Sequence, residues 1–310
     1  MNRRDFLVTG TAAVSWGCLA GGKVFGQVAA PTPATPPPLR VQFTPLRRGV
    51  GIFTARGGTI GWLANADALV VVDTQFADAA TRFLQEWPER EGRLIDAVIN
   101  THHHGDHTGG NATMRPFARQ LVAHEAVPAL QLAAAARNPN APAPTVAEAL
   151  FAESWKMDAG DETVSARYFG PAHTGGDIVV HCERANVVHL GDLVFNRTYP
   201  VTDRAGGCRV RSWIQVLETI ATTYSADTLF VLGHGKPAFG VTGTTADVLV
   251  MRDFLTAVVE QVEADLRDGK SKAEIVTRQN FDQFPDFRVE QNSRLPINLG
   301  VVYDELTNAT

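Results

Sequence analysis

The stretch THHHGDHTGG, residues 101–110, carries four histidines and one aspartate. It directly follows a run of apolar residues that is typical of a buried strand. Imidazole and carboxylate groups suit zinc, iron or manganese, so the stretch predicts a metal site at the end of that strand. His102 and His104 lie two apart in an extended segment, and they point the same way and can share one ion. Asp106 and His107 follow on the turn and can hold a second ion.

The composition is that of a soluble globular protein. Hydrophobic residues make up 45% of the chain and charged residues 20%, which is an ordinary balance. The formal net charge of -5 argues against binding to the phosphate backbone of a nucleic acid, so no nucleic-acid partner is expected. The cysteines Cys18, Cys182 and Cys208 are too few for a disulfide framework or a thiolate zinc cluster. Whether Cys182 and Cys208 pair stays open: the periplasm would allow a disulfide, whereas folding in the cytoplasm favours free thiols.

The N-terminal residues predict an export signal. Residues 2–7, NRRDFL, resemble a bacterial twin-arginine signal, and the apolar stretch that follows is shorter than the ~20 residues that span a bilayer. We therefore expect a signal peptide at 1–30, a proline-rich linker at 31–40 and a mature domain at 41–310. The mature form is expected to be periplasmic and without a stable membrane span. Its partner during export is the twin-arginine translocation machinery.

Strands and helices alternate along the rest of the chain. Strands are expected at 50–53, 60–63, 68–72, 94–100, 120–123, 167–169, 177–182, 186–190 and 228–232. Helices are expected at 77–87, 114–119, 127–137, 213–224, 245–268, 272–279 and 296–306. Helices that alternate with buried strands predict an α/β fold in which layers of helix pack on sheet.

The pattern His-x-His-x-Asp-His at 102–107, with threonine before it and two glycines after it, resembles the signature of the metallo-β-lactamase superfamily. Four further motifs of that family occur in the family's order. They are Asp73 at a strand end, GPAHTGGD at 170–177, LGD at 190–192 and GHG at 233–235. The resemblance covers about residues 50–237 and implies a four-layered αβ/βα sandwich.

The resemblance also implies which residues hold metal. It assigns seven ligands to two zinc ions: His102, His104 and His173 at one site, Asp106, His107 and His234 at the other, and Asp192 as the bridge between them. Iron and manganese are the alternatives to zinc. Asp106 is in addition the catalytic residue that hydrogen-bonds the nucleophile, and Asp73 supports the histidine stretch from behind the ligands. His103 lies between two ligands and should face away from the metal.

The implied reaction is hydrolysis by a hydroxide that the two ions share. The substrate is a small molecule with an ester, lactone, thioester or amide bond, β-lactams included. The alternative is a periplasmic metal-binding accessory protein of a redox pathway with little turnover. This alternative rests on a similarity to periplasmic members of the superfamily that are associated with quinoprotein systems. The similarity lies in residues 191–195, 200–203 and Trp213. Seven ligands favour catalysis, since four ligands close a structural zinc site.

The pocket walls are expected in loops, at 57–58, 138–155 and 197–211. Their larger side chains, which are too generic to name a substrate, are Phe151, Trp155, Tyr199 and Arg204.

Overall fold

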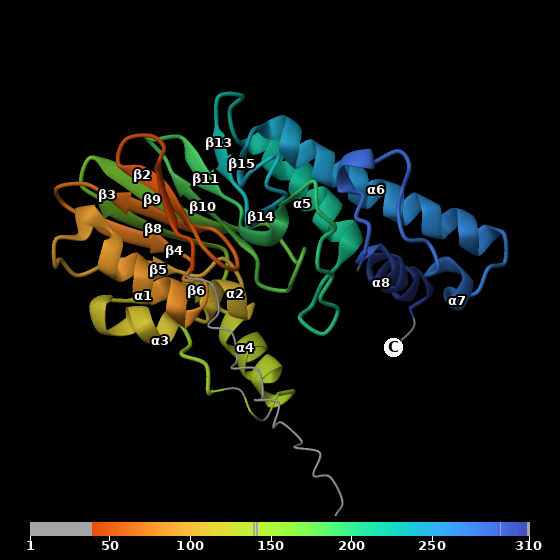
Figure 1. Ribbon diagram of the computed structural model, residues 1–310, viewed down its shortest axis with the longest axis horizontal. Coiled ribbons are helices and arrows are strands. Elements are labelled where there is room, and N and C mark those ends of the chain that lie inside the picture. The colour runs from red at the N-terminus through yellow and green to blue at the C-terminus, as the bar shows by residue number, and fades with distance from the viewer. Residues whose placement is uncertain (1–38, 139, 141, 292, 309–310) are drawn as a thin grey trace, which may run out of the picture. The chain divides into compact units, whose positions relative to one another are not determined.

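Two β-sheets face each other in the computed structural model of the protein, which describes residues 39–138, 140, 142–291 and 293–308 (Figure 1). The signal peptide expected at 1–30 and most of the linker expected at 31–40 lie outside the described residues. Apolar side chains from both sheets form one core between them.

The first sheet combines an antiparallel half with a parallel half. Its strands lie in the order β1-β2-β3-β4-β5-β6-β7. They span Gln42–Pro45, Val50–Thr54, Ile60–Ala64, Leu69–Val72, Ala97–Ile99, Leu121–His124 and Ala149–Phe151. The pairs from β1 to β4 are antiparallel and those from β4 to β7 are parallel. The carboxyl ends of β4 and β5 therefore meet at one edge of the sheet.

The second sheet is mostly antiparallel, with strands in the order β15-β13-β11-β10-β9-β8. From β8 to β11 the strands span Ser154–Ala159, Glu162–Tyr168, Ile178–Cys182 and Val187–His189, and β13 and β15 span Leu229–Val231 and Thr242–Gly243. Only β11 and β13 pair parallel among these described strands, so their carboxyl ends also lie together. β12 (Phe195–Asn196) and β14 (His234–Gly235) form a separate parallel pair.

Helices cover the outer face of each sheet (Figure 1). The first sheet packs against α1, α3 and α4, at Ala77–Glu86, Asn111–Met114 and Val127–Ala136. The second packs against α5 and α6, at Val210–Thr223 and Thr245–Arg267, and α8, at Leu295–Thr307, packs on α6. Short helical turns lie at Pro88–Arg90, Gly105–Thr108 (α2), Arg115–Phe117, Gly191–Leu193, Lys272–Ile275 (α7) and Pro285–Phe287. Three cores between four layers confirm the predicted α/β fold and its αβ/βα sandwich.

β4 shows why a central strand of this fold is apolar throughout. Leu69 and Val71 belong to the core under the helices of the first sheet. Val70 and Val72 belong to the core between the two sheets. Because successive side chains of a strand point to opposite faces, a strand buried on both faces reads as a continuous apolar run.

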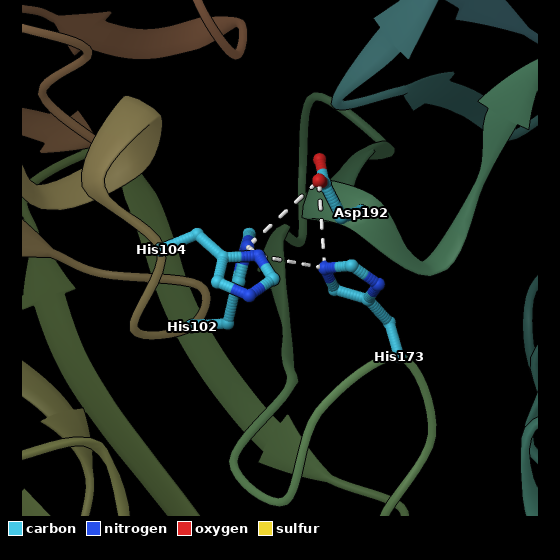
Figure 2. Close-up of side chains that lie close together, drawn as sticks. All are labelled: His102, His104, His173 and Asp192. Carbon is cyan, nitrogen blue, oxygen red and sulfur yellow. Dashed lines mark hydrogen bonds and ion pairs between the residues drawn. The ribbon is translucent and has the colours of Figure 1, made fainter. Parts of the chain in front are cut away.

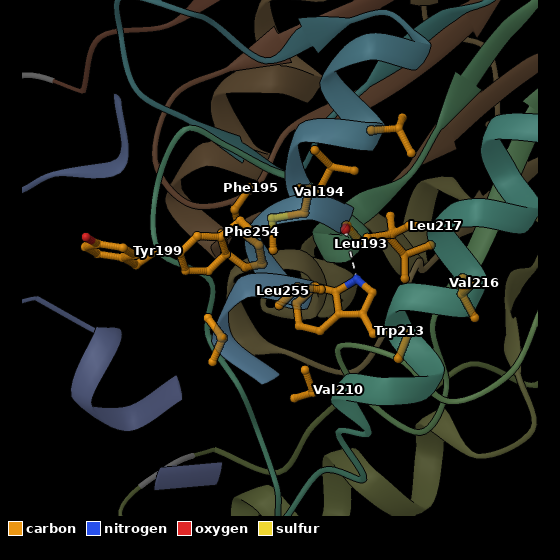
Figure 3. Close-up of a cluster of buried hydrophobic side chains, with 14 of the residues drawn as sticks. Leu193, Val194, Phe195, Tyr199, Val210, Trp213, Val216, Leu217, Phe254 and Leu255 are labelled. Carbon is orange, nitrogen blue, oxygen red and sulfur yellow. Dashed lines mark hydrogen bonds between the residues drawn. The ribbon is translucent and has the colours of Figure 1, made fainter. Parts of the chain in front are cut away.

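A second core fixes the turn that follows β11. The indole of Trp213 on α5 is fully buried, and its Nε1 donates a hydrogen bond to the carbonyl oxygen of Leu193 at 3.0 Å (Figure 3). Gly191 begins this turn at a positive φ of 50°, and a Cβ there would lie 2.5 Å from the Thr101 hydroxyl. The turn is therefore specified by a glycine at its start and a buried tryptophan beneath it.

The structure differs from the sequence-based expectation mainly at the edge strands of the two sheets. β1, β7, β8 and β15 were not predicted, because each has at most one buried residue and therefore lacks the apolar run of a central strand. The helix expected at 114–119 is wrong: α3 ends at Met114 and a 3-10 turn containing Pro116 follows. None of the described helices combines the length and apolar character that a bilayer crossing requires.

Candidate metal centre

The polar residues that follow β4, β5, β11 and β13 converge at one edge of the sandwich. Backbone hydrogen bonds connect the two sheets there. Ile178 donates its amide N–H to the carbonyl oxygen of Thr101 at 2.9 Å, and Thr59 donates to that of Gly233 at 3.1 Å. Ligands commonly bind at the carboxyl ends of strands in α/β proteins, so this edge is where a site is expected.

The first group of donor atoms comes from His102, His104, His173 and Asp192 (Figure 2). His104 Nδ1 lies 3.1 Å from His102 Nε2 and 3.0 Å from His173 Nε2. Asp192 Oδ2 lies 3.8 Å from His102 Nε2 and 3.5 Å from His173 Nε2. Four donor atoms thus surround one point, as the tetrahedral coordination of a metal ion requires.

The second group consists of Asp106, His107 and His234. His234 Nε2 lies 3.1 Å from Asp106 Oδ2 and 3.5 Å from His107 Nε2. Asp192 also faces this group, since its Oδ1 lies 3.0 Å from His107 Nε2 and its Oδ2 lies 3.4 Å from His234 Nε2. The carboxylate of Asp192 therefore stands between the two groups, and the structure brings together all seven side chains expected as ligands.

The outward-facing ring nitrogens decide where the protons of the first group reside. His104 Nε2 donates to Asp203 Oδ2 at 3.0 Å, and His173 Nδ1 donates to the carbonyl oxygen of Val201 at 2.8 Å. His102 Nδ1 donates to the Thr101 hydroxyl at 3.0 Å, because that hydroxyl already donates to Asp73. A neutral imidazole carries one N–H, so the inward nitrogens present bare lone pairs to one another.

Lone pairs that face each other at 3.0–3.1 Å repel unless a cation lies between them. In tetrahedral zinc sites, bonds of about 2.0–2.1 Å place neighbouring donor atoms about 3.3 Å apart. The fully buried Asp192 Oδ1 makes no well-directed hydrogen bond with protein although His107 Nε2 is near. The donor set, its spacing and this orphaned oxygen all fit a divalent metal.

Asp73 lies behind the second group, as expected. Its Oδ1 accepts from the Thr101 amide at 2.7 Å, and its Oδ2 accepts from the Thr101 hydroxyl at 2.8 Å and from His107 Nδ1 at 2.7 Å. Asp73 is fully buried and has a positive φ of 64°, a conformation that non-glycine residues rarely adopt. A strained backbone held by three hydrogen bonds is typical of a functional site.

Burial and carboxylates set the charges of the cluster. Burial lowers the pKa of His173 to about 3, so its imidazole is neutral, as a metal ligand must be. Burial opposes a charge on His234, but Asp192 and a hydrogen bond to Asp106 outweigh it and raise the pKa to about 9. Burial also opposes ionisation of Asp192, yet His107 and His234 hold its pKa well below the usual value. The second group thus stabilises positive charge.

Sequence reasoning missed the role of the segment 200–206. Val201 and Asp203 are the hydrogen-bond partners that orient His173 and His104. Asp203 Oδ2 also lies 3.3 Å from His103 Nε2, so His103 faces this carboxylate rather than the first group, as expected. A carbonyl such as that of Val201 leaves no signal in the sequence, because every residue has one.

The pocket walls agree in part with those expected, since Thr198 and Val201 come from the loop expected at 197–211. A cavity of about 250 Å³ opens onto His104, Asp106, Asp192 and His234, and its remaining lining residues are Phe195, Thr198, Val201, Gly235 and Arg294. Of the side chains expected in the walls, Tyr199 is buried in the core of the second sheet, and Phe151 and Trp155 pack against the core between the sheets. Arg204 lines another cavity. The expectation failed for Phe151, Trp155 and Tyr199 because their side chains gain more from burial in a core. Cys182 and Cys208 are free and buried.

Replacing Asp203 by alanine is expected to weaken metal binding about 10- to 100-fold, a typical effect of losing the partner of a ligating histidine. His104 would no longer be held with Nδ1 towards the other donors. Competition with a chromophoric chelator measures the affinity.

Asp203→Asn keeps an acceptor oxygen and should recover part of the affinity, which a general loss of structure would not allow. The control is Asp282→Ala, since the Asp282 side chain is 96% exposed. Wild-type affinity in Asp203→Ala would show that the contact does not position His104.

Comparisons with known proteins extend these observations. The sequence profile of the metallo-beta-lactamase superfamily matches residues 53–259. Two curated relatives are hydroxyacylglutathione hydrolases. That of Chromohalobacter salexigens is 36% identical over 75 residues, and that of Synechococcus sp. is 43% identical over 58 residues. The matches cover 22% and 18% of this chain and only 28% and 21% of the relatives.

Solved structures share the fold. A double mutant of the sec-alkyl sulfatase PisA1 superposes with a TM-score of 0.68 at 13% identity, covering 87% of this chain and 51% of that one. A metallo-beta-lactamase from Pontibacter korlensis superposes with a TM-score of 0.57 at 19% identity, covering 70% of this chain and 99% of that one. At these identities the likeness shows the fold alone.

Proposed function

Because the chain belongs to the metallo-beta-lactamase superfamily, we propose that it is a hydrolase with two divalent metal ions, zinc in the first instance. The seven side chains of the two groups hold the ions. The observation that carries the proposal is the position of Asp192, whose two oxygens contact both groups. A structural zinc site needs only four ligands, so a second group sharing one carboxylate favours catalysis.

Two such ions supply an activated water at neutral pH and stabilise the negative charge that develops on the substrate. The chain's own residues do the rest. Asp192 keeps the two groups together, and Asp106 accepts a proton or hydrogen bond from the water at the cavity side of the second group. The Asp106 side chain is 27% exposed, whereas that of Asp192 is 3% exposed, so Asp106 is the carboxylate within reach of solvent.

The bond that is cleaved is proposed to be that of an ester, lactone, thioester or amide, β-lactams included. The matches to hydroxyacylglutathione hydrolases support a carbonyl centre as the point of attack. The cavity of about 250 Å³ is slightly smaller than the ~300 Å³ at the lower end for ligand pockets, which favours a small molecule. We also propose export to the periplasm, on the strength of Arg3 and Arg4 in the twin-arginine-like segment.

Removing the metal is expected to abolish hydrolysis of every substrate that the protein accepts. The zinc-loaded protein is tested on a panel of esters, lactones, thioesters, phosphodiesters and β-lactams. Chelation should lower turnover at least about 100-fold, because no other group in the site generates a nucleophile at neutral pH. Returning two equivalents of zinc should restore it, with metal content measured by atomic absorption.

Protein that binds two zinc ions tightly and turns over no member of the panel would contradict the hydrolase. That result would favour the metal-binding accessory protein of a redox pathway instead.

A further inference from the structure

The C-terminal helix α8 contributes a charge to the cavity of the metal centre. Arg294, which precedes α8, lines the same cavity as His104, Asp106, Asp192 and His234. Among the described residues that line this cavity, it is the one lysine or arginine. It also lies beyond residues 53–259, so it belongs to no part of the chain that the family profile matches.

The backbone of Arg294 is fixed close to the metal centre. Leu295 and Asn298 are buried, and the amides of Ile297 and Asn298 both donate to the carbonyl oxygen of Arg294 at 3.0 Å. Asn298, on the same helix face as Arg294, donates from Nδ2 to the carbonyl oxygen of Pro200 at 2.9 Å.

Asn298 thereby joins α8 to the segment that orients two of the expected ligands. Its Nδ2 also lies 3.2 Å from the hydroxyl of Thr202. The residues on either side of Thr202, Val201 and Asp203, are the hydrogen-bond partners of His173 and His104. The start of α8 is therefore anchored to the same segment, 200–203, that orients these two expected ligands.

The guanidinium of Arg294 is available to a ligand. Within the described part of the chain, no side-chain ion pair or hydrogen bond engages it. Two other cations, which lie next to lining residues in the sequence, have protein partners. Arg197 pairs with Asp247, and Lys236 Nζ donates to the carbonyl oxygens of Asp286 and Arg288.

The charge of the cavity favours an anion at this position. The carboxylates of Asp106 and Asp192 face metal ions in the proposed enzyme, and those ions neutralise them. Arg294 then remains as an uncompensated positive charge at the opening. Its forked N–H donors match the two oxygens of a carboxylate or a related oxyanion.

We propose that Arg294 binds an oxyanion of the substrate, so that the preferred substrate is a small carboxylate-bearing ester, thioester or amide. This inference rests on the proposed function, because it specifies the substrate class of the same site. Phe195 and Val201 are the apolar side chains that line the same cavity. The anion is held by α8 while the cleaved bond lies at the metal centre.

Binding measured by calorimetry tests the proposal without turnover. The probes are mercaptoacetate and its methyl ester, because both carry a thiol that coordinates zinc and only one carries a carboxylate. Zinc-loaded wild-type protein should bind mercaptoacetate about 10- to 100-fold more tightly than the ester, as expected for a charge-assisted hydrogen bond. In Arg294→Ala this preference should fall about 10-fold or more relative to wild type, because any binding of the carboxylate to zinc is common to both proteins, and Arg294→Lys should keep part of it.

The matched control is Arg267→Ala at the exposed end of α6, which lines none of the cavities described above and should retain the full preference. Metal content, measured in every variant, should equal that of wild type. Equal binding of the two thiols by wild type, or an unchanged preference in Arg294→Ala, would overturn the role of Arg294. Failure of the whole substrate panel would instead overturn the proposed hydrolase, so the two failures are distinguishable.

Discussion

Asp192→Ala is expected to lower hydrolysis at least about 100-fold and to leave one tightly bound metal ion per chain. Its Oδ2 contacts the first group and His234, and its Oδ1 lies 3.0 Å from His107 Nε2. Without this carboxylate the three histidines of the first group still provide three donors. The second group keeps Asp106, His107 and His234 but loses the oxygens that link it to the first, so its affinity should fall most.

The measurement is metal content after dialysis, together with turnover at saturating zinc. A melting curve for each protein confirms that the folded form is compared. Asp282→Ala serves as the control for removing a carboxylate, because its side chain is almost fully exposed. If Asp192 only stabilises the turn after β11, the variant should be less stable yet bind two ions as tightly as wild type. Two tightly bound ions with normal turnover would therefore exclude bridging.

The fold and the convergence of the expected ligands were predictable because their signals are local. The residues 101–107 form a contiguous segment after a buried strand, and His173, Asp192 and His234 each follow or precede an apolar run. Such runs are apolar because both faces of the strand are buried, as for β4. A polar residue directly at the end of such a run is therefore placed at the edge of a sheet by the strand itself.

The residues that orient the ligands were not predictable in this way. Val201 acts through its backbone, and Asp203 reaches His104 across 99 positions of sequence. Arg294 stands in no motif, and its position depends on how α8 packs against the segment 200–203. These contacts are made by loops and by a C-terminal helix. The positions of these segments depend on tertiary packing, which local periodicity in the sequence does not reveal.

The exchange of Asp73 for alanine is expected to be the most destabilising substitution in the site, even without metal. The carboxylate is fully buried and accepts hydrogen bonds from the Thr101 amide, the Thr101 hydroxyl and His107 Nδ1. Removing it leaves three buried donors without a partner. Breaking a buried charged pair in this way typically costs about 3–5 kcal/mol, which is a large part of the ~5–15 kcal/mol that stabilises a folded protein.

Urea unfolding of the metal-free proteins measures this loss directly, since neither turnover nor metal affinity enters the comparison. Asp73→Asn retains the size of the side chain but turns an N–H₂ group towards one of the three donors, so it should recover only part of the stability. Asp282→Ala should change the free energy of unfolding by less than about 1 kcal/mol, because its ion pair with Arg288 is exposed. An Asp73→Ala protein as stable as wild type would mean that the hydrogen bonds of Asp73 do not hold the histidine stretch in place. In that case the geometry of His107 would have to be imposed by bound metal alone.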